Sequence, residues 1–109
     1  MAEEITWENA QQQLVGKLTL VELQHVDARG KQLLLEHAYG VIESVDAKDG
    51  IFIDCQGIRT GTKLALPGEL SPFKAARPGL YKLETTGEEI EDPDFFSTWT
   101  ITHKDQLAV

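Results

Sequence analysis

Apolar residues alternate with polar ones in short segments along most of the chain, and glycines separate many of these segments. Because successive side chains of a β-strand point to opposite faces, this alternation predicts strands that lie with one face against a core. We expect strands near residues 15–27, 32–46, 50–56, 62–66, 80–86 and 96–103. At 109 residues the chain is long enough to bury one core, so the sequence predicts a single, mainly β domain over residues 1–109.

The turns and faults of the first three expected strands indicate how the sheet bends. Gly30 and Gly50 end the two connecting turns, where a hairpin needs a positive φ, so these strands are expected to form an antiparallel meander. The alternation changes phase between Leu20 and Val21, which predicts a β-bulge there, and Gly40 allows a sharp bend in the second strand. Long bent strands are how small barrels turn corners, so we expect a small antiparallel β-barrel, closed or nearly closed.

Two short helical segments are expected outside the strands. Thr6 can cap a helix whose apolar residues recur at helical spacing and which ends before Gly16. This helix would cover one end of the core. A second, single helical turn is expected at residues 71–76, within the long connection of residues 57–79, because serine followed by proline is typical of a helix start.

Two stretches resemble a known class of small barrels in the order of their residues. They are Leu14-Val15-Gly16-Lys17, after the expected first helix, and Gly40-Val41-Ile42-Glu43-Ser44-Val45-Asp46, and the proteins they resemble are the Sm-like and SH3-like barrels. The resemblance covers residues 6–56. It implies an N-terminal helix that leads into a strongly bent sheet, with a glycine at the bend of the second strand. The arginine or lysine with which Sm-like proteins contact RNA has no clear counterpart here, so RNA binding is not implied.

A second similarity lies in the C-terminal half of the chain. The motifs Pro78-Gly79-Leu80-Tyr81, Thr86-Gly87-Glu88 and Asp92-Pro93-Asp94-Phe95 are similar to those of a small, uncharacterised bacterial protein family. This similarity implies a bacterial origin and no particular activity.

The composition indicates a soluble protein of the cytoplasm. The N-terminus is acidic, and uninterrupted apolar runs reach three residues, whereas a helix needs about 20 to cross a bilayer. Cys55 is the only cysteine, so no intrachain disulfide and no zinc site built from several cysteines can form. We therefore expect no membrane association and a reducing compartment.

The negative charge is concentrated in one stretch. Six of the 18 acidic residues and none of the 10 basic residues lie between positions 84 and 94, so this stretch carries −6 of the net charge of −8. We expect a solvated hairpin whose negative electrostatic field attracts a basic protein partner. Binding of a cation by these carboxylates is an alternative, although the stretch does not have the sequence pattern of a calcium-binding loop. The scattered basic residues disfavour nucleic acid binding. The six candidate partner-binding residues are Glu84, Glu88, Glu89, Glu91, Asp92 and Asp94.

Three other candidate site residues fall on the apolar side of their expected strands: His37, Cys55 and His103. If they met inside a barrel, they could hold a zinc or copper ion, or cysteine and histidine could form a nucleophile pair. Metal sites usually place two ligands close in sequence, and a buried cysteine ordinarily packs as a small apolar group. No phosphate-binding loop, nucleophile elbow, zinc-protease helix or dinucleotide fingerprint occurs.

Two functions follow from these residues. The first is a non-catalytic binding module without a cofactor, which engages another protein through its surface or through the acidic stretch at 84–94, as an immunity or inhibitor protein covers a basic enzyme site. The second is a small enzyme or a metal or ligand carrier that uses His37, Cys55 and His103. The lack of paired titratable groups close in sequence favours the first. A homodimer is compatible with both functions. Only six residues follow the last expected strand, which is little to cover its edge, so a second copy could pair with that edge instead.

Overall fold

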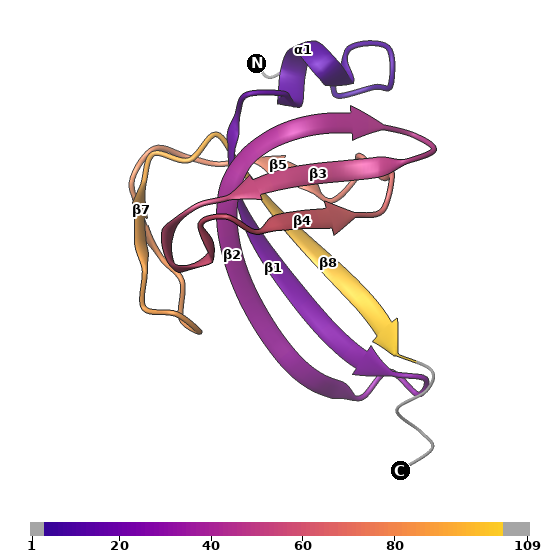
Figure 1. The fold of residues 1–109 in the computed structure, drawn as a ribbon, viewed down its shortest axis with the longest axis vertical. Helices are drawn as coiled ribbons and strands as arrows, with labels where there is room; N and C mark the ends of the chain where they lie inside the picture. Colours follow the sequence, from indigo (N-terminus) through magenta and orange to yellow (C-terminus); the bar gives the residue numbers. More distant parts are fainter. Residues whose placement is uncertain (1–3, 104–109) are drawn as a thin grey trace.

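Two β-sheets make up most of the structure, a computed structural model that describes residues 4–103. The mainly β architecture expected from the alternation is confirmed (Figure 1). The elements in chain order are α1 (Ala10–Leu14), β1 (Leu18–Asp27), β2 (Gln32–Asp46), β3 (Gly50–Cys55), the 3-10 turn η1 (Gly57–Arg59), β4 (Lys63–Leu66), β5 (Phe73–Ala75), β6 (Leu80–Lys82), β7 (Glu89–Glu91) and β8 (Phe95–His103).

The larger sheet has six strands in the order β4-β3-β2-β1-β8-β5. The first three strands form the expected antiparallel meander, and the other neighbours are also antiparallel except β1 and β8, which run parallel. The sheet is therefore mixed. Its edge strands β4 and β5 do not pair with each other within residues 4–103, so the described chain forms a bent sheet without hydrogen-bonded closure.

The turns and the bend of the meander depend on three glycines. Gly30 and Gly50 have φ angles of 86° and 99°, as the hairpin turns require. Gly40 serves a different purpose, because a Cβ atom added there would lie 2.3 Å from the carbonyl oxygen of Asp54 in β3. Glycine thus allows the close approach of β2 and β3 along the strongly curved β2 (Figure 1).

The predicted bulge between Leu20 and Val21 is wrong. β1 pairs with β2 in continuous register from Leu18 to His25, and the register shifts only beyond that point. Leu20 and Val21 are both buried because they lie on opposite faces of a sheet that is covered on both sides. Two successive apolar residues here reflect two buried faces, which ordinary strand geometry allows without an extra residue.

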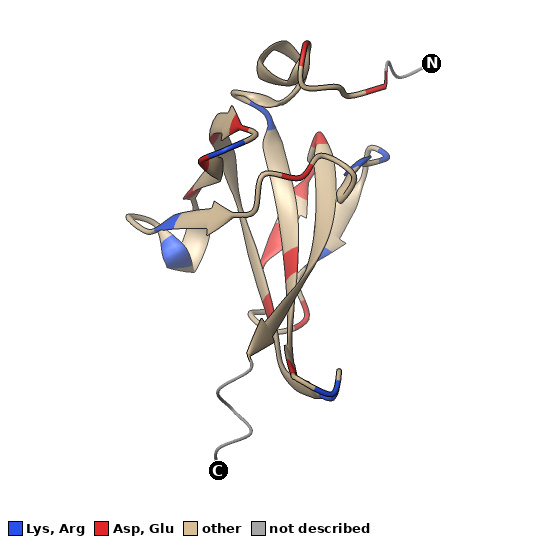
Figure 2. Cartoon of the chain, turned by 90° about the vertical axis from the view of Figure 1, so that its right-hand side faces the viewer, with Lys and Arg blue, Asp and Glu red and all other residues tan. Residues whose placement is uncertain are grey.

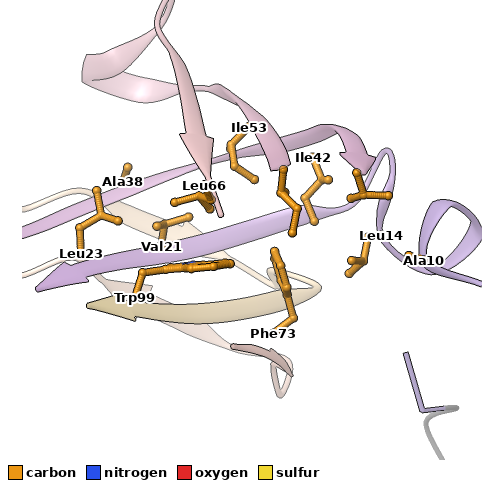
Figure 3. Packing of buried hydrophobic residues seen from close by; sticks show 12 residues of the cluster. Ala10, Leu14, Val21, Leu23, Ala38, Ile42, Ile53, Leu66, Phe73 and Trp99 are labelled. Atoms are coloured by element: carbon orange, nitrogen blue, oxygen red, sulfur yellow. The ribbon is translucent and has the colours of Figure 1, made fainter. Parts of the chain in front are cut away.

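The main core lies on the face of the large sheet that includes Val21. Figure 3 shows Trp99 and Phe73 together in this core, with Leu14 of α1 at one end. The rings of Trp99 and Phe73 meet edge to face, with centroids 5.7 Å apart. Leu66 from β4 and Phe73 from β5 both belong to this cluster, so the two edges of the sheet converge on one core although they do not pair.

The helical expectations are met in part. Ala10 and Leu14 of α1 are buried against the main core, as a covering helix requires, but the residue at the helix start is Asn9, whose Oδ1 accepts the Thr6 backbone N–H at 2.8 Å. The helical turn expected at residues 71–76 is wrong, because Phe73 is buried there and pairs with β8 as part of β5. No helix in the described part of the chain is long and apolar enough to cross a membrane.

The second sheet is a hairpin of β6 and β7 that covers the other face of the large sheet. Leu83 and Ile90 pack there against Leu20 of β1. The strand expected at residues 80–86 ends at Lys82, and the acidic stretch supplies its own strand, β7, instead of a simple tip. The unit formed by residues 79–94 is called the acidic hairpin below.

Candidate functional site

Three of the six acidic residues fasten the acidic hairpin, two of them to its surroundings and one across its own base. Each uses a side-chain oxygen to accept a backbone N–H group: Glu88 from Ile58 at 3.0 Å, Asp92 from Gly79 at 2.8 Å and Asp94 from Leu18 at 2.9 Å. These bonds reach η1, the base of the hairpin itself and β1. Charged acceptors make strong hydrogen bonds, so half of the acidic residues hold the hairpin in place.

The other three acids, Glu84, Glu89 and Glu91, are exposed. Their side chains make no hydrogen bond or ion pair with any residue between 4 and 103. Glu89 and Glu91 flank the buried Ile90 in β7, so strand geometry directs them away from the large sheet. The structure thus separates the six predicted partner-binding residues into three that fasten the hairpin and three that face outward.

An exposed apolar residue accompanies these outward acids. Leu80 pairs with Glu91 across the hairpin and is 64% exposed. Lys82, the next outward residue of β6, pairs with Glu89. The outer face of the hairpin therefore presents one leucine and one lysine among three carboxylates, a surface suited to both charge attraction and apolar contact.

His37 of β2 joins the large sheet to the acidic hairpin. Its backbone N–H donates to Thr85 Oγ1 at 3.1 Å, and its Nδ1 lies 3.0 Å from the same hydroxyl oxygen. The ring Nε2 lies 3.2 Å from Glu22 Oε2, and the backbone carbonyl accepts a hydrogen bond from Arg59 Nε at 3.2 Å. His37 therefore connects β2 to the acidic hairpin, to β1 and to the residue that ends η1.

A cavity of about 230 Å³ lies beside His37, between the hairpin and β1 and β8. Apolar side chains such as Leu20, Leu83 and Phe96 form part of its wall, and Glu22 and His37 supply polar groups. A space of this size holds a small molecule rather than a ligand of drug size.

A cluster of two histidines and one glutamate lies where β1, β2 and β8 run side by side (Figure 1). His25 Nδ1 lies 2.7 Å from His103 Nε2, and His25 Nε2 lies 2.6 Å from Glu36 Oε1. Arg59 Nη2 donates to the other carboxylate oxygen of Glu36 at 3.1 Å. The hydrogen bond from Arg59 lowers the pKa of Glu36, burial opposes this, and the hydrogen bond with His25 lowers it further, with a net lowering.

Cys55 is buried, 3% exposed, and its Sγ lies 3.9 Å from the carbonyl oxygen of Ile53. Burial raises the pKa of this thiol, which favours the protonated and less nucleophilic form.

The structure places the three interior candidates in separate surroundings. His37 contacts the acidic hairpin, His103 contacts His25, and Cys55 lies at the end of β3. Within residues 4–103, no group of three or more His, Cys, Asp or Glu side chains is arranged to hold a metal ion.

Of the three histidines, His25 is the one that sequence reasoning did not name as a site residue. It lies 78 residues from His103, and only the parallel pairing of β1 with β8 brings the two rings together. No local pattern indicates a parallel pairing between the first and the last strand. No protein-family model, curated protein or solved structure matches this chain.

Proposed function

We propose that this protein is a non-catalytic binding module whose acidic hairpin engages a basic surface of another protein. The observation that carries this proposal is that the acids of the hairpin have two different roles. Three of them accept backbone hydrogen bonds that fix the hairpin, and the other three are exposed and face outward: Glu88, Asp92 and Asp94 in the first group, Glu84, Glu89 and Glu91 in the second. A hairpin fixed before binding loses little conformational entropy when a partner arrives.

The charge distribution supports a basic partner. Concentrated carboxylates accelerate the approach of a positively charged protein, and the exposed Leu80 offers apolar contact once the two surfaces meet. In the view of Figure 2, Lys and Arg lie at several separate places, with no continuous basic face among the residues drawn. An immunity or inhibitor protein that covers a basic enzyme site is the specific form of this proposal.

We also propose that the domain is a variant of the SH3-like and Sm-like small barrels. Supporting this relation are the N-terminal helix, the bent meander and Gly40 at the close approach of β2 and β3. The relation concerns architecture, and the function proposed here does not depend on it.

The test compares two sets of charge-neutralised variants. Glu84→Gln/Glu89→Gln/Glu91→Gln removes the outward acids, and Glu8→Gln/Asp54→Asn/Glu69→Gln makes the same charge change at exposed positions elsewhere. A partner captured by wild-type protein is identified, purified and titrated against all three proteins by calorimetry. We expect the hairpin variant to bind at least about tenfold more weakly, and the control to bind as wild type.

The salt dependence gives a second readout. Wild-type affinity should fall as salt rises, and the hairpin variant should lose most of this dependence. Equal affinities for the wild type and the hairpin variant would remove the acidic hairpin as the binding site.

The cavity beside His37 favours a second candidate function, the carriage of a small apolar molecule with one hydrogen-bonding group. Of the three residues of the predicted interior site, this candidate function involves His37 and does not involve Cys55 or His103. Its test is a titration with small aromatic and aliphatic fragments, followed by NMR at residues around the cavity. Shifts at Leu20 and Leu83 that disappear in His37→Ala would support it, whereas fragments that leave these signals unchanged would exclude it.

A further inference from the structure

One edge of β8 has no strand partner for most of its length. β8 pairs with β1 from Phe95 to His103, but on its other side β5 pairs only with residues 95–97. Residues 98–103 therefore leave one edge without a neighbouring strand in the described part of the chain. The backbone N–H and C=O groups of such an edge are a template for pairing with another strand.

The corresponding edge of β2 is covered at His37. Beyond the part of β2 that pairs with β3, the backbone N–H of His37 donates to Thr85 Oγ1, and its C=O accepts from Arg59 Nε. Two side chains thus occupy the backbone groups of His37 that an added strand would need at this position. β4, the outermost strand on that side, is four residues long and begins with Lys63, and short charged edges resist pairing.

The free edge of β8 lacks such protection. Residues 98–102 read Thr98-Trp99-Thr100-Ile101-Thr102, without a charge, a proline or a glycine. Threonine, tryptophan and isoleucine all favour strands. Two copies of a chain with a net charge of −8 repel each other over much of their surfaces, and this edge is a place where neither copy brings an acidic side chain.

We propose that residues 99–103 pair antiparallel with the same segment of a second copy, around a two-fold axis at Ile101. A two-fold axis perpendicular to the joined sheet keeps each residue and its copy on the same face. Directly opposed residues of antiparallel strands also share a face, so the axis must lie between one residue and its own copy, and not between two consecutive residues. β5 occupies the edge up to residue 97, and a register centred on Ile101 uses the edge beyond it.

The side chains fit this register. Thr100 lies opposite Thr102 of the second copy on one face, and Trp99 lies opposite His103 on the other. Threonine pairs stabilise antiparallel strands. The existing cross-strand neighbours Leu34, His25 and Ile101 form a row, which continues through the second Ile101 into the second copy. Across the joined sheet this row contains two histidines and four apolar side chains, and the Leu34 at each end is 53% exposed in one copy.

The first test measures the mass of the full chain by sedimentation equilibrium over a range of concentrations, where we expect a dimer. Thr100→Lys/Thr102→Lys places lysines opposite each other across the axis, and both positions are exposed in a single copy. This variant should remain folded by circular dichroism and become a monomer. Gln12→Lys/Thr62→Lys is the control, since it adds the same charge at exposed positions, one of them beside β4, and should stay dimeric.

The second test fixes the register. In a Cys55→Ala background, Ile101→Cys places two thiols opposite each other across the axis, within disulfide distance, whereas Thr98→Cys places them several residues apart. Mild oxidation should crosslink the Ile101→Cys variant and leave the Thr98→Cys variant largely uncrosslinked. A wild-type monomer at all concentrations, a dimer that persists in Thr100→Lys/Thr102→Lys, or equal crosslinking of the two variants would overturn the proposal.

Discussion

His25 Nδ1 lies 2.7 Å from His103 Nε2, which joins the first and the last strand of the large sheet through their side chains. A hydrogen bond between two ring nitrogens needs a proton on one and a lone pair on the other. On its far side His25 contacts the Glu36 carboxylate, which Arg59 also binds. The four side chains form one connected network from β8 through β1 and β2 to η1.

Removing His25 should destabilise the fold, because both Glu36 and His103 lose a partner. We expect His25→Ala to lower the free energy of unfolding by about 1.5–3 kcal/mol, the usual range for hydrogen bonds that involve a charged group. Urea unfolding followed by tryptophan fluorescence measures this change. Gln24→Ala is the control in the same strand, since it removes a bond between exposed side chains and should cost about 0.5 kcal/mol or less. Equal losses in the two variants would show that the network adds nothing.

The lowered pKa of Glu36 predicts a pH-dependent contribution to stability. Arg59 and His25 hold the folded-state pKa below the ordinary value of 4.5, so the carboxylate stabilises the fold above that pH. The contribution is lost as the pH falls through the folded-state pKa. Wild type should therefore exceed Glu36→Gln in stability at neutral pH, and the difference should shrink below pH 4.5. Urea unfolding over a pH series checks this, with the exposed Glu69→Gln as control; a pH-independent difference contradicts it.

The buried thiol of Cys55 should react slowly in the folded protein. Burial raises its pKa above the ordinary value of 9.0, so above that pH the unfolded chain ionises first and stability falls. We expect a thiol reagent to label Cys55 only after unfolding in urea. Ile58→Cys in a Cys55→Ala background is the control, since position 58 is 71% exposed and should react at once. Rapid labelling of native Cys55 would instead support a nucleophilic role.

The sequence predicts those parts of the fold that depend on local patterns. Alternation and two turn glycines place β2 at residues 32–46, as observed, and the meander follows from them. The parallel pairing of β1 with β8 depends on contacts between distant residues, and no local feature of either strand indicates it. Leu20 and Val21 show the same limit, because the second cover of the sheet comes from residues 83–90.

The candidate site was predictable to a similar extent. Composition indicates that residues 84–94 form an acidic surface feature. Which acids face outward depends on the N–H groups that lie nearby in the folded chain, such as those of Leu18 and Ile58. Likewise, the alternation predicts that His37 and His103 lie on the same strand faces as their apolar neighbours. It does not predict which side chain each ring contacts, because those contacts depend on pairing between distant segments.

Gly40 should tolerate no larger residue. The Cβ of Gly40→Ala would lie 2.3 Å from the Asp54 carbonyl oxygen, so β2 and β3 must separate, and we expect a loss of about 3 kcal/mol. Gly30→Ala is the matched comparison. No heavy atom lies within 4 Å of its added Cβ, but its φ of 86° strains an alanine, at about 1 kcal/mol. Thermal and urea unfolding give both values, and a smaller loss for Gly40→Ala than for Gly30→Ala would refute the close-approach argument.

Thr85 should protect the edge of β2 at one residue. Thr85→Val keeps the shape of the side chain but removes the oxygen that accepts the His37 N–H, so this amide should exchange with solvent about tenfold faster. Thr85→Ser keeps the hydroxyl and should restore slow exchange. The Leu23 amide in β1, a strand paired on both sides, is the internal reference and should not change. If both amides accelerate equally in Thr85→Val, the variant weakens the whole fold and the side chain does not act as a local cover of the β2 edge.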